Sequence, residues 1–248
     1  MASPYTSTEC PLVGAMERST DSRRCDTGRY DPKIRGDMGS DTTDLICAWQ
    51  ELLARHTLSA HVTNVGQTLL SDWSQPHRYH HTIDHLRDVL THIDELADHA
   101  SDPDLVRLAG WYHDAVYNCR HDDEENSALR AERELRALEL KPAAVSEVAR
   151  LVRLTATHSP ADGDSNGETL CDADLAILGA HPVRYAAYVE AVRAEYARVP
   201  DDDFRRGRAK VLRALLTTPT LFHTPLGHRR WEAAARTNLI QELHAITN

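Results

Sequence analysis

The sequence predicts an all-α protein, and three observations support this fold class. From Asp41 onward, apolar residues recur at steps of three and four, as they do along one face of a helix. No alternating run of β-branched residues, which would be typical of a strand, is present. Of the 248 residues 41% are hydrophobic and 27% charged, enough apolar material for a buried core. About nine helices over residues 41–248 fit a single helical bundle.

Residues 1–40 differ in composition from the rest of the chain. They are rich in Ser, Thr, Gly, Pro, Asp and Arg, contain few large apolar side chains and carry balanced charge. Such a stretch cannot bury enough apolar surface to offset the entropy lost on ordering. We therefore expect a flexible extension here. The alternative is a misassigned start codon, because Met38 lies just before the first helical pattern.

The first two helices are predicted by capping residues and apolar stripes. Asp41 or Thr43 can cap a helix that continues through Leu53. The next helix is expected over residues 82–100, where apolar side chains again recur at helical spacing. The stripe of the first helix comprises Leu45, Ile46, Trp49, Leu52 and Leu53, and that of the second comprises Ile83, Leu86, Leu90, Ile93 and Leu96.

Prolines and composition define the remaining helices. Pro103 opens the third one, since proline loses no amide hydrogen bond at a first helical position. Residues 123–140 are rich in Glu, Arg, Ala and Leu, and Pro142 separates them from the next helix. A polar loop is expected at residues 159–168. The predicted segments after residue 100 are 102–112, 123–140, 143–156, 172–179, 182–198, 202–216 and 228–245.

Charge and hydropathy exclude several function classes. The formal net charge of −10 argues against a general nucleic-acid binder, because that role needs clustered cations. No run approaches the about 18 to 20 apolar residues that span a bilayer, so no membrane partner is expected. The first residues show no signal-peptide pattern. Five cysteines without a CxxC spacing indicate a reduced, cytoplasmic protein with incidental thiols. A homo-oligomer is compatible with the sequence.

Histidine is the unusual feature of the composition. Eight of the 15 histidines lie between His77 and His121. His81 and His85 are four residues apart, so on a helix they share a face. Neutral imidazole is the commonest protein ligand of metal ions, and two such groups on one side can converge on an ion. The alternative for this pair alone is a surface or capping role.

Two further motifs contain carboxylates beside apolar residues. His113 and Asp114 are adjacent within the otherwise apolar segment WYHDAVY. Asp172 and Asp174 follow the polar loop and precede an apolar helical pattern; Asp172 alone could be a helix cap. A carboxylate in an apolar helix is costly unless it is paired or bound to metal. The order of the motifs, a histidine pair, then His-Asp, then a distal Asp, favours a metal site.

This ordered combination resembles the HD superfamily of metal-dependent phosphohydrolases, whose core pattern is H…HD…D on a helical bundle. The likeness covers about residues 75–245 and is greatest to a bacterial subgroup of largely uncharacterised predicted phosphohydrolases. It implies an HD-type hydrolase domain over residues 41–248. The residues that carry it are RYHHTIDH (78–85), AGWYHDAVY (109–117), DEENSA (123–128), TATH (155–158), LCDADLAILG (170–179), EYARV (195–199), GRAKVLRALL (207–216) and ARTNL (235–239).

The resemblance implies a metal-ligand set and a proton donor. The expected metal ligands are His85, His113, Asp114 and Asp172, and Asp114 is also assigned to catalysis. His81 matches the histidine that donates a proton to the leaving group in distantly related cyclic-nucleotide phosphodiesterases. Those enzymes have Tyr-His-Asn at this point, whereas residues 80–82 here are His-His-Thr. Orienting substrate or water is the alternative role of His81.

The implied chemistry is phosphoester hydrolysis by water activated on a metal ion. A divalent ion offsets phosphate charge and lowers the pKa of a bound water. Mixed nitrogen and oxygen ligands suit Mn, Fe, Co, Ni or Zn better than Ca, with Mg also allowed. The expected partner is a small phosphorylated substrate, for example a nucleotide.

Other residues are candidates for supporting roles. Glu124 is expected to orient the attacking water or a ligand histidine, or else to stabilise a helix N-terminus. His158 is expected to bind substrate phosphate or a second metal, or else to interact with a helix end. Asp174 is expected to be a cap or a hydrogen-bond acceptor rather than a ligand. Substrate phosphate is assigned to Arg78, Lys210 and Arg236, with Arg120 ranked after them and a solvated surface position as the alternative.

Two other functions fit the same motifs. Some HD-type proteins are di-iron oxygenases, which need further histidines between the HD pair and the distal Asp. His121 and His158 could supply them here. The other alternative is a non-catalytic module that binds a metal or a nucleotide.

Overall fold

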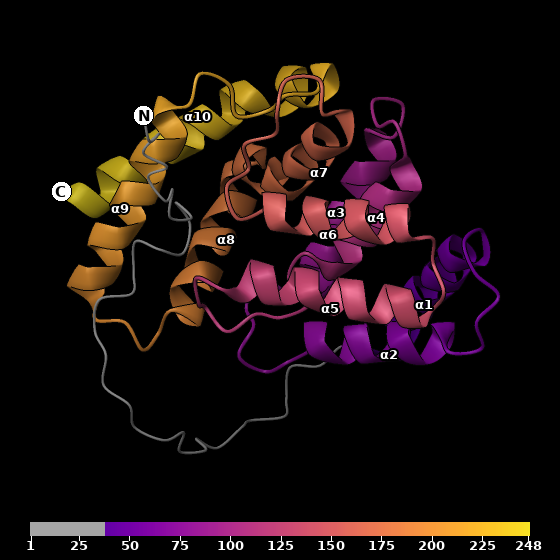
Figure 1. Ribbon diagram of the computed structural model, residues 1–248. Coiled ribbons are helices and arrows are strands. Elements are labelled where there is room, and N and C mark those ends of the chain that lie inside the picture. The colour runs from indigo at the N-terminus through magenta and orange to yellow at the C-terminus, as the bar shows by residue number, and fades with distance from the viewer. Residues whose placement is uncertain (1–37) are drawn as a thin grey trace, which may run out of the picture.

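The computed structural model describes residues 38–248, and the regular structure there is entirely helical (Figure 1). This confirms the predicted all-α class. The predicted extension at residues 1–40 lies outside the described residues except for its last three positions, where α1 begins. The helices of the described part are α1 (Met38–Ala54), α2 (Val62–Trp73), α3 (Ile83–Glu95), α4 (Pro103–Tyr112), α5 (Asp123–Ala137), α6 (Pro142–Leu154), α7 (Ser165–Leu175), the 3₁₀ helix η1 (Ala176–Gly179), α8 (Pro182–Glu195), α9 (Asp201–Thr217) and α10 (Pro225–Thr247).

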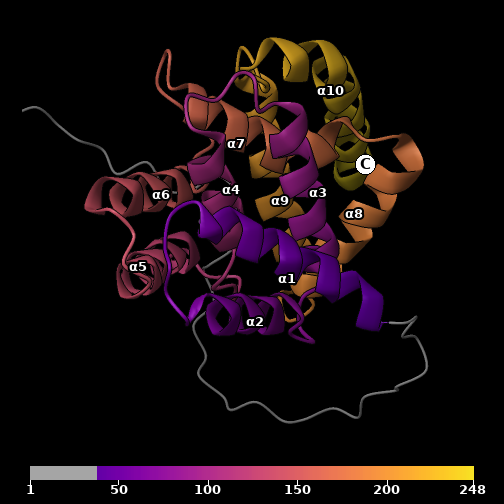
Figure 2. The same cartoon turned by 90° about the vertical axis from the view of Figure 1, so that its right-hand side faces the viewer.

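Helix α2 was not predicted, because its sequence contains Gly and several β-branched or polar residues that are poor helix formers. Tertiary packing supports it instead. Its Gly66 faces the indole of Trp49 in α1, and a Cβ there would lie only 2.5 Å from Trp49 Cδ1. The Trp49 indole N–H donates to the carbonyl of Val62 at 2.8 Å. The two helices lie side by side in both views (Figure 2).

Helix α7 begins earlier than the sequence predicted. The expected loop at residues 159–168 ends at Asp164, whose side chain accepts a hydrogen bond from the backbone N–H of Gly167 at 3.0 Å and caps the helix. Residues 165–175 are therefore helical, and only the predicted residues 176–179 remain as a separate short helix. Asp172 and Asp174 thus lie within α7 and not before it.

Helix α4 lies in the middle of the core. Its residues from Leu105 to Tyr112 are buried except Arg107, and it packs against α3, α5, α6 and α7. Aromatic residues fix its C-terminal end: the ring centroids of Trp49 and Trp111 are 5.1 Å apart, and the Trp73 indole donates to the Trp111 carbonyl at 3.1 Å. This packing sets the position of the two residues that follow α4, His113 and Asp114.

Helices α9 and α10 are joined by a buried ion pair. Arg208 donates hydrogen bonds to Glu242 at 2.7 and 3.0 Å, and both side chains are 5% exposed. The hydroxyl of Tyr185 in α8 also donates to Glu242. This network holds the last three helices together. None of the described helices is long and apolar enough to cross a membrane.

Removing one partner of this pair tests its role. Glu242→Ala leaves the Arg208 guanidinium buried without its carboxylate, so the free energy of unfolding should fall by about 3 to 5 kcal/mol. Urea denaturation followed by circular dichroism measures the change. In the control Asp94→Ala, which removes the exposed partner of Arg107, the loss should stay below about 1 kcal/mol. Equal losses would contradict the assigned role of the buried pair.

Candidate metal centre

Three of the predicted ligands come together at one point. The ligand atoms of His85, His113 and Asp114 lie within 4.8 Å of one another. His85 is in the first turn of α3, and His113 and Asp114 follow the end of α4. The Nε2 atoms of the two histidines are 3.2 Å apart, and His113 Nε2 is 3.2 Å from Asp114 Oδ2. These residues could hold a metal ion.

Asp174 supplies a fourth donor atom to this group. Its Oδ1 lies 3.1 Å from His85 Nε2 and 3.6 Å from His113 Nε2. Donors that bind one transition-metal ion at about 2.1 Å are separated from each other by about 3.0 to 3.4 Å. Three of the spacings are 3.1 to 3.2 Å and two are longer, with His85 Nε2 3.9 Å from Asp114 Oδ2, so the two imidazoles and two carboxylates could surround a single ion after small shifts. We refer to His85, His113, Asp114 and Asp174 as the four-donor cluster.

The orientation of His113 is fixed by its other ring nitrogen. Its Nδ1 lies 2.9 Å from the carbonyl oxygen of Gly110, which can only accept a hydrogen bond. Nδ1 therefore carries a proton in either protonation state of the ring, and Nε2 is the nitrogen that faces the cluster and could bind a metal after losing its own proton. The indole of Trp73 packs against His113, with ring centroids 5.4 Å apart. This arrangement fixes the ring so that Nε2 faces the cluster.

Asp172 was predicted as a ligand, but the structure places Asp174, and not Asp172, beside His85 and His113. The carboxylate of Asp172 is buried and accepts hydrogen bonds from the backbone N–H groups of His223 and Thr224 at 2.7 and 2.8 Å. A Cβ at Gly227 would lie 2.4 Å from Asp172 Oδ2, so α10 begins in direct contact with this carboxylate. Residues two apart on a helix point about 200° apart. Because α7 begins before Asp172, only one of the two aspartates can face the cluster.

The charges within the cluster depend on one another. Burial disfavours every charge there, yet the carboxylates of Asp114 and Asp174 raise the pKa of His113 well above its usual value. For the two aspartates burial acts in the opposite sense, but His113 outweighs it and lowers both pKa values. The two partly buried carboxylates favour a positive charge at this point, which a protonated His113 supplies and which a divalent ion could supply instead.

His81 lies beside the cluster, and its position depends on Glu195. His81 Nδ1 is 2.8 Å from a carboxylate oxygen of Glu195, the last residue of α8, whose side chain is fully buried. Because the ionised carboxylate only accepts, Nδ1 carries the proton and Nε2 faces Asp114 at 3.9 Å. Burial lowers the pKa of His81, but Glu195 and Asp114 outweigh this effect and raise it. His81 is thus a candidate proton donor beside the metal site.

Glu195 also holds the segment that carries His81. One of its oxygens accepts hydrogen bonds from three successive backbone N–H groups, those of residues 79–81, at 2.8 to 3.0 Å. The hydroxyl of Tyr117 donates to the other oxygen at 2.9 Å. Sequence reasoning gave Glu195 no role, although it opens the motif EYARV. No local pattern marks it, since its partners are far away in the chain.

Two further predicted residues lie near the cluster. His158 Nε2 is 2.8 Å from Asp174 Oδ2, and its backbone has a left-handed φ of 49°. Such a conformation is uncommon for a non-glycine residue and is found preferentially at functional sites. Burial raises the pKa of Glu124 to about 7, and the neighbouring Asp114 adds to this rise. His81, Asp114, Glu124, His158 and Asp174 all line one cavity of about 100 Å³.

The predicted phosphate-binding cations do not line this cavity. Arg78 is buried and donates to the backbone carbonyls of His81 and Asp114 at 3.2 and 2.8 Å, which fixes the segments that hold those residues. Lys210 is exposed on α9. Arg236 pairs with Glu232 and donates to carbonyls of residues 216–219. Arg208 is the arginine that the structure places at the cavity, bound to Glu242.

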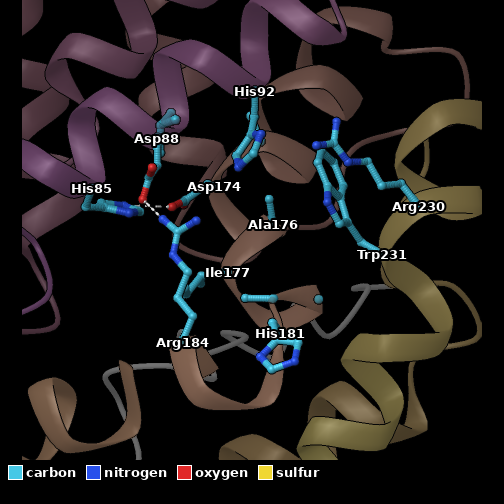
Figure 3. Close-up of a pocket in the computed structure, with 14 residues that line it drawn as sticks. His85, Asp88, His92, Asp174, Ala176, Ile177, His181, Arg184, Arg230 and Trp231 are labelled. Carbon is cyan, nitrogen blue, oxygen red and sulfur yellow. Dashed lines mark hydrogen bonds and ion pairs between the residues drawn. The ribbon is translucent and has the colours of Figure 1, made fainter. Parts of the chain in front are cut away.

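A second and larger cavity adjoins the cluster on another side of Asp174. It measures about 370 Å³ and is lined by residues of α3, η1, α8 and α10, with Asp174 at the end of α7 (Figure 3). His85 and Asp174 belong to its wall, and Asp174 also lines the smaller cavity, so the two cavities meet at this residue. A ligand bound at the cluster would have access to both.

Comparison of the chain with protein-family models, with curated proteins and with solved structures found no match. The motif resemblance to the HD superfamily therefore stays a prediction. What the molecule can do must be argued from the geometry of the four-donor cluster and its surroundings.

Metal binding tests whether Asp174 or Asp172 is the ligand. Removal of a residue that only hydrogen-bonds to a metal ligand lowers metal affinity by about 10- to 100-fold. Asp174→Ala removes a donor atom itself, so its affinity for Mn²⁺ or Co²⁺ should fall by more than this. Asp172→Ala should lower the affinity by no more than about 100-fold, while it lowers the melting temperature. Metal content after dialysis and calorimetric titration measure both. Lost binding in Asp172→Ala with intact binding in Asp174→Ala would restore the original assignment.

The raised pKa of Glu124 predicts a pH dependence of stability in the metal-free protein. Its pKa rises from an ordinary 4.5 to about 7, so the folded state binds this proton more tightly than the unfolded chain does. The resulting stabilisation is present below pH 4.5 and is lost as the pH rises through 7. In Glu124→Gln the free energy of unfolding should therefore decline less between about pH 5 and about pH 8 than in the parent, as urea denaturation would show.

The exposed Glu139→Gln is the matched control, and its pH profile should follow that of the parent protein. A Glu124→Gln profile identical to the parent's would show that this carboxyl group titrates as it does in the unfolded chain.

Proposed function

We propose that this protein is a metal-dependent phosphohydrolase of the HD type that cleaves a phosphoester of a small phosphorylated metabolite, for example a nucleotide. The observation that carries the proposal is the four-donor cluster. The ligand atoms of His85, His113 and Asp114 lie within 4.8 Å of one another, and Asp174 lies 3.1 Å from His85. Asp114 and Asp174 line a cavity that also contains His81, Glu124 and His158.

The four donors would hold a divalent ion such as Mn, Fe, Co, Ni or Zn, with Mg allowed, because the set mixes nitrogen and oxygen ligands. Such an ion, when bound, offsets phosphate charge and lowers the pKa of water. Asp114 and Asp174 together carry the two negative charges that match a divalent cation. The His113 imidazole enters as a neutral ligand because its Nδ1 proton is bound to Gly110.

The neighbouring residues would position the substrate and move protons. His81 presents Nε2 to the cavity while Glu195 holds its Nδ1, a pairing that keeps the ring in one tautomer and supports an imidazolium. A protonated His81 can donate to the leaving oxygen of the ester. Glu124, with its pKa raised to about 7, can exchange a proton with water near neutral pH. His158, whose Nε2 lies 2.8 Å from Asp174 Oδ2, would contact a phosphate oxygen.

The oxygenase alternative has less support. In this alternative, His121 and His158 would bind a second iron. His158 Nε2 lies 2.8 Å from Asp174 Oδ2. His121, the other one, is exposed and lines neither of the two cavities described above. A second iron would thus lack one of its expected imidazoles.

The central experiment is a phosphate-release screen. Purified protein is loaded in turn with Mn²⁺, Co²⁺, Ni²⁺, Mg²⁺ and Zn²⁺ and incubated with p-nitrophenyl phosphate and a panel of nucleotides. We expect turnover with at least one ion, and we expect Asp114→Ala to lose both bound metal and turnover. Phosphate release by an Asp114→Ala protein at the parent rate would overturn the assignment. No release with any ion and substrate would favour a binding module instead.

The pairing of His81 with Glu195 predicts a separation of metal binding from catalysis. Glu195→Gln keeps the size of the side chain but removes its charge, and its amide can donate to His81 Nδ1 and so force the wrong tautomer. We expect kcat to fall by about 100-fold or more while metal content is unchanged. The exposed Glu190→Gln on the same helix is the control and should retain kcat. An unchanged kcat in Glu195→Gln would exclude His81 as the proton donor.

A further inference from the structure

The larger cavity beside the cluster has features that phosphoester cleavage alone does not require. Its volume of about 370 Å³ falls in the range of small-molecule sites, whereas the cavity that contains His81 measures about 100 Å³. The smaller space suits little more than the reacting group. The remainder of a substrate would therefore extend past Asp174 into the larger cavity.

Two arginines stand in the wall of this larger cavity. Arg184, from α8, reaches toward Asp88 and Asp174 on one side, and Arg230, from α10, stands across the cavity beside Trp231 (Figure 3). The two guanidinium groups come from helices that are separate in sequence, and both are turned toward the same space. We refer to Arg184 and Arg230 as the arginine pair.

Each arginine already pairs with a carboxylate, but the ion pair is exposed and another anion can compete for it. Arg184 pairs with Asp88 and Arg230 pairs with Glu95, and the arginine side chains are 54% and 47% exposed. Exposed ion pairs contribute little net stability, because water and salt compete with them. Each guanidinium group also has five N–H donors, more than one carboxylate can use. An incoming phosphate can thus bind without a large cost.

The charge balance of the wall changes when the cluster is filled. The charged groups around the cavity are the two arginines, their partners Asp88 and Glu95, and Asp174, which sum to one negative charge. A divalent ion in the cluster would neutralise Asp174 and so remove this excess of negative charge. The histidines of the wall, His92 and His181, add further hydrogen-bonding groups. With that repulsion removed, the unused N–H donors of the two guanidinium groups can bind an anion.

The floor of the cavity is rigid. Gly179 in η1 approaches Trp231 so closely that a Cβ would lie 2.6 Å from Trp231 Cβ. Trp231 is further packed by Phe222 and His92, with ring centroids at 5.5 and 5.0 Å. The arginine of α10 is thus carried on a fixed helix next to a buried ring, which limits the ordering cost of binding a ligand.

We propose that the arginine pair binds a second phosphate group of the substrate, so that the site selects molecules with two separate phosphates. This inference rests on the proposed function for its claim that the ligand is a substrate. The reacting phosphate lies at the four-donor cluster, and the second lies in the larger cavity. Guanidinium groups bind phosphate through paired hydrogen bonds, which a neutral sugar or a hydrophobic tail would leave unused.

The test compares bisphosphates with monophosphates that are otherwise alike. Binding of adenosine 3′,5′-bisphosphate and adenosine 5′-monophosphate, and of fructose 1,6-bisphosphate and fructose 6-phosphate, is measured calorimetrically on the Mn²⁺-loaded protein. We expect a bisphosphate to bind at least about tenfold more tightly than its monophosphate. In the double variant Arg184→Gln/Arg230→Gln that advantage should fall by about 10- to 100-fold, with monophosphate affinity changed by less than about threefold.

The double variant Arg136→Gln/Arg206→Gln is the matched control, because both arginines are exposed, pair with carboxylates and lie outside the cavity. It should bind like the parent. If no bisphosphate binds better than its monophosphate, or if the arginine pair can be replaced without loss, the proposal is overturned. If bisphosphate binding depends on the arginine pair but no phosphate is released, the anion site is supported and the hydrolase function is rejected. If phosphate is released equally well by the parent and the arginine double variant, the hydrolase function is supported and the anion site is rejected.

Discussion

The candidate site depends on two partly buried carboxylates, Asp114 and Asp174, which lie beside two imidazoles at the place where α3, α4 and α7 meet. An uncompensated buried charge costs several kcal/mol, which is a large part of a domain's stability. The packing of α4 delivers Asp114 to this place, and the early start of α7 delivers Asp174. A divalent ion is the partner that we propose for these charges.

Buried carboxylates also fix the segments around the site. Asp172 accepts two backbone amides at the start of α10, and Glu195 accepts three in residues 79–81. Asp123 accepts two more in the loop between α4 and α5. Each of these groups ties an irregular segment to a helix. Their shared effect is that His81 and the cavity walls have defined positions before any ligand arrives.

The sequence predicted the helical class and three of the four donors, because the signals for both are local. Apolar stripes mark most of the helices, and the order of His85, His113 and Asp114 marks the site. Whether Asp172 or Asp174 completes the cluster depends on where α7 begins. The polar composition of residues 159–168 predicted a loop there, so the early start of α7 at residue 165 could not be predicted. Helix α2 and Glu195 escaped prediction for a related reason. Their roles arise from contacts with residues distant in the chain, such as Trp49 for α2.

Anomalous X-ray diffraction from crystals of the Co²⁺- or Mn²⁺-loaded protein, collected at the absorption edge of the metal, tests the central claim most directly. The account predicts one strong peak between His85 Nε2, His113 Nε2, Asp114 Oδ2 and Asp174 Oδ1, with Asp172 still bound to the backbone of residues 223 and 224. A peak coordinated by Asp172, or no peak at this cluster in metal-loaded crystals, would contradict it.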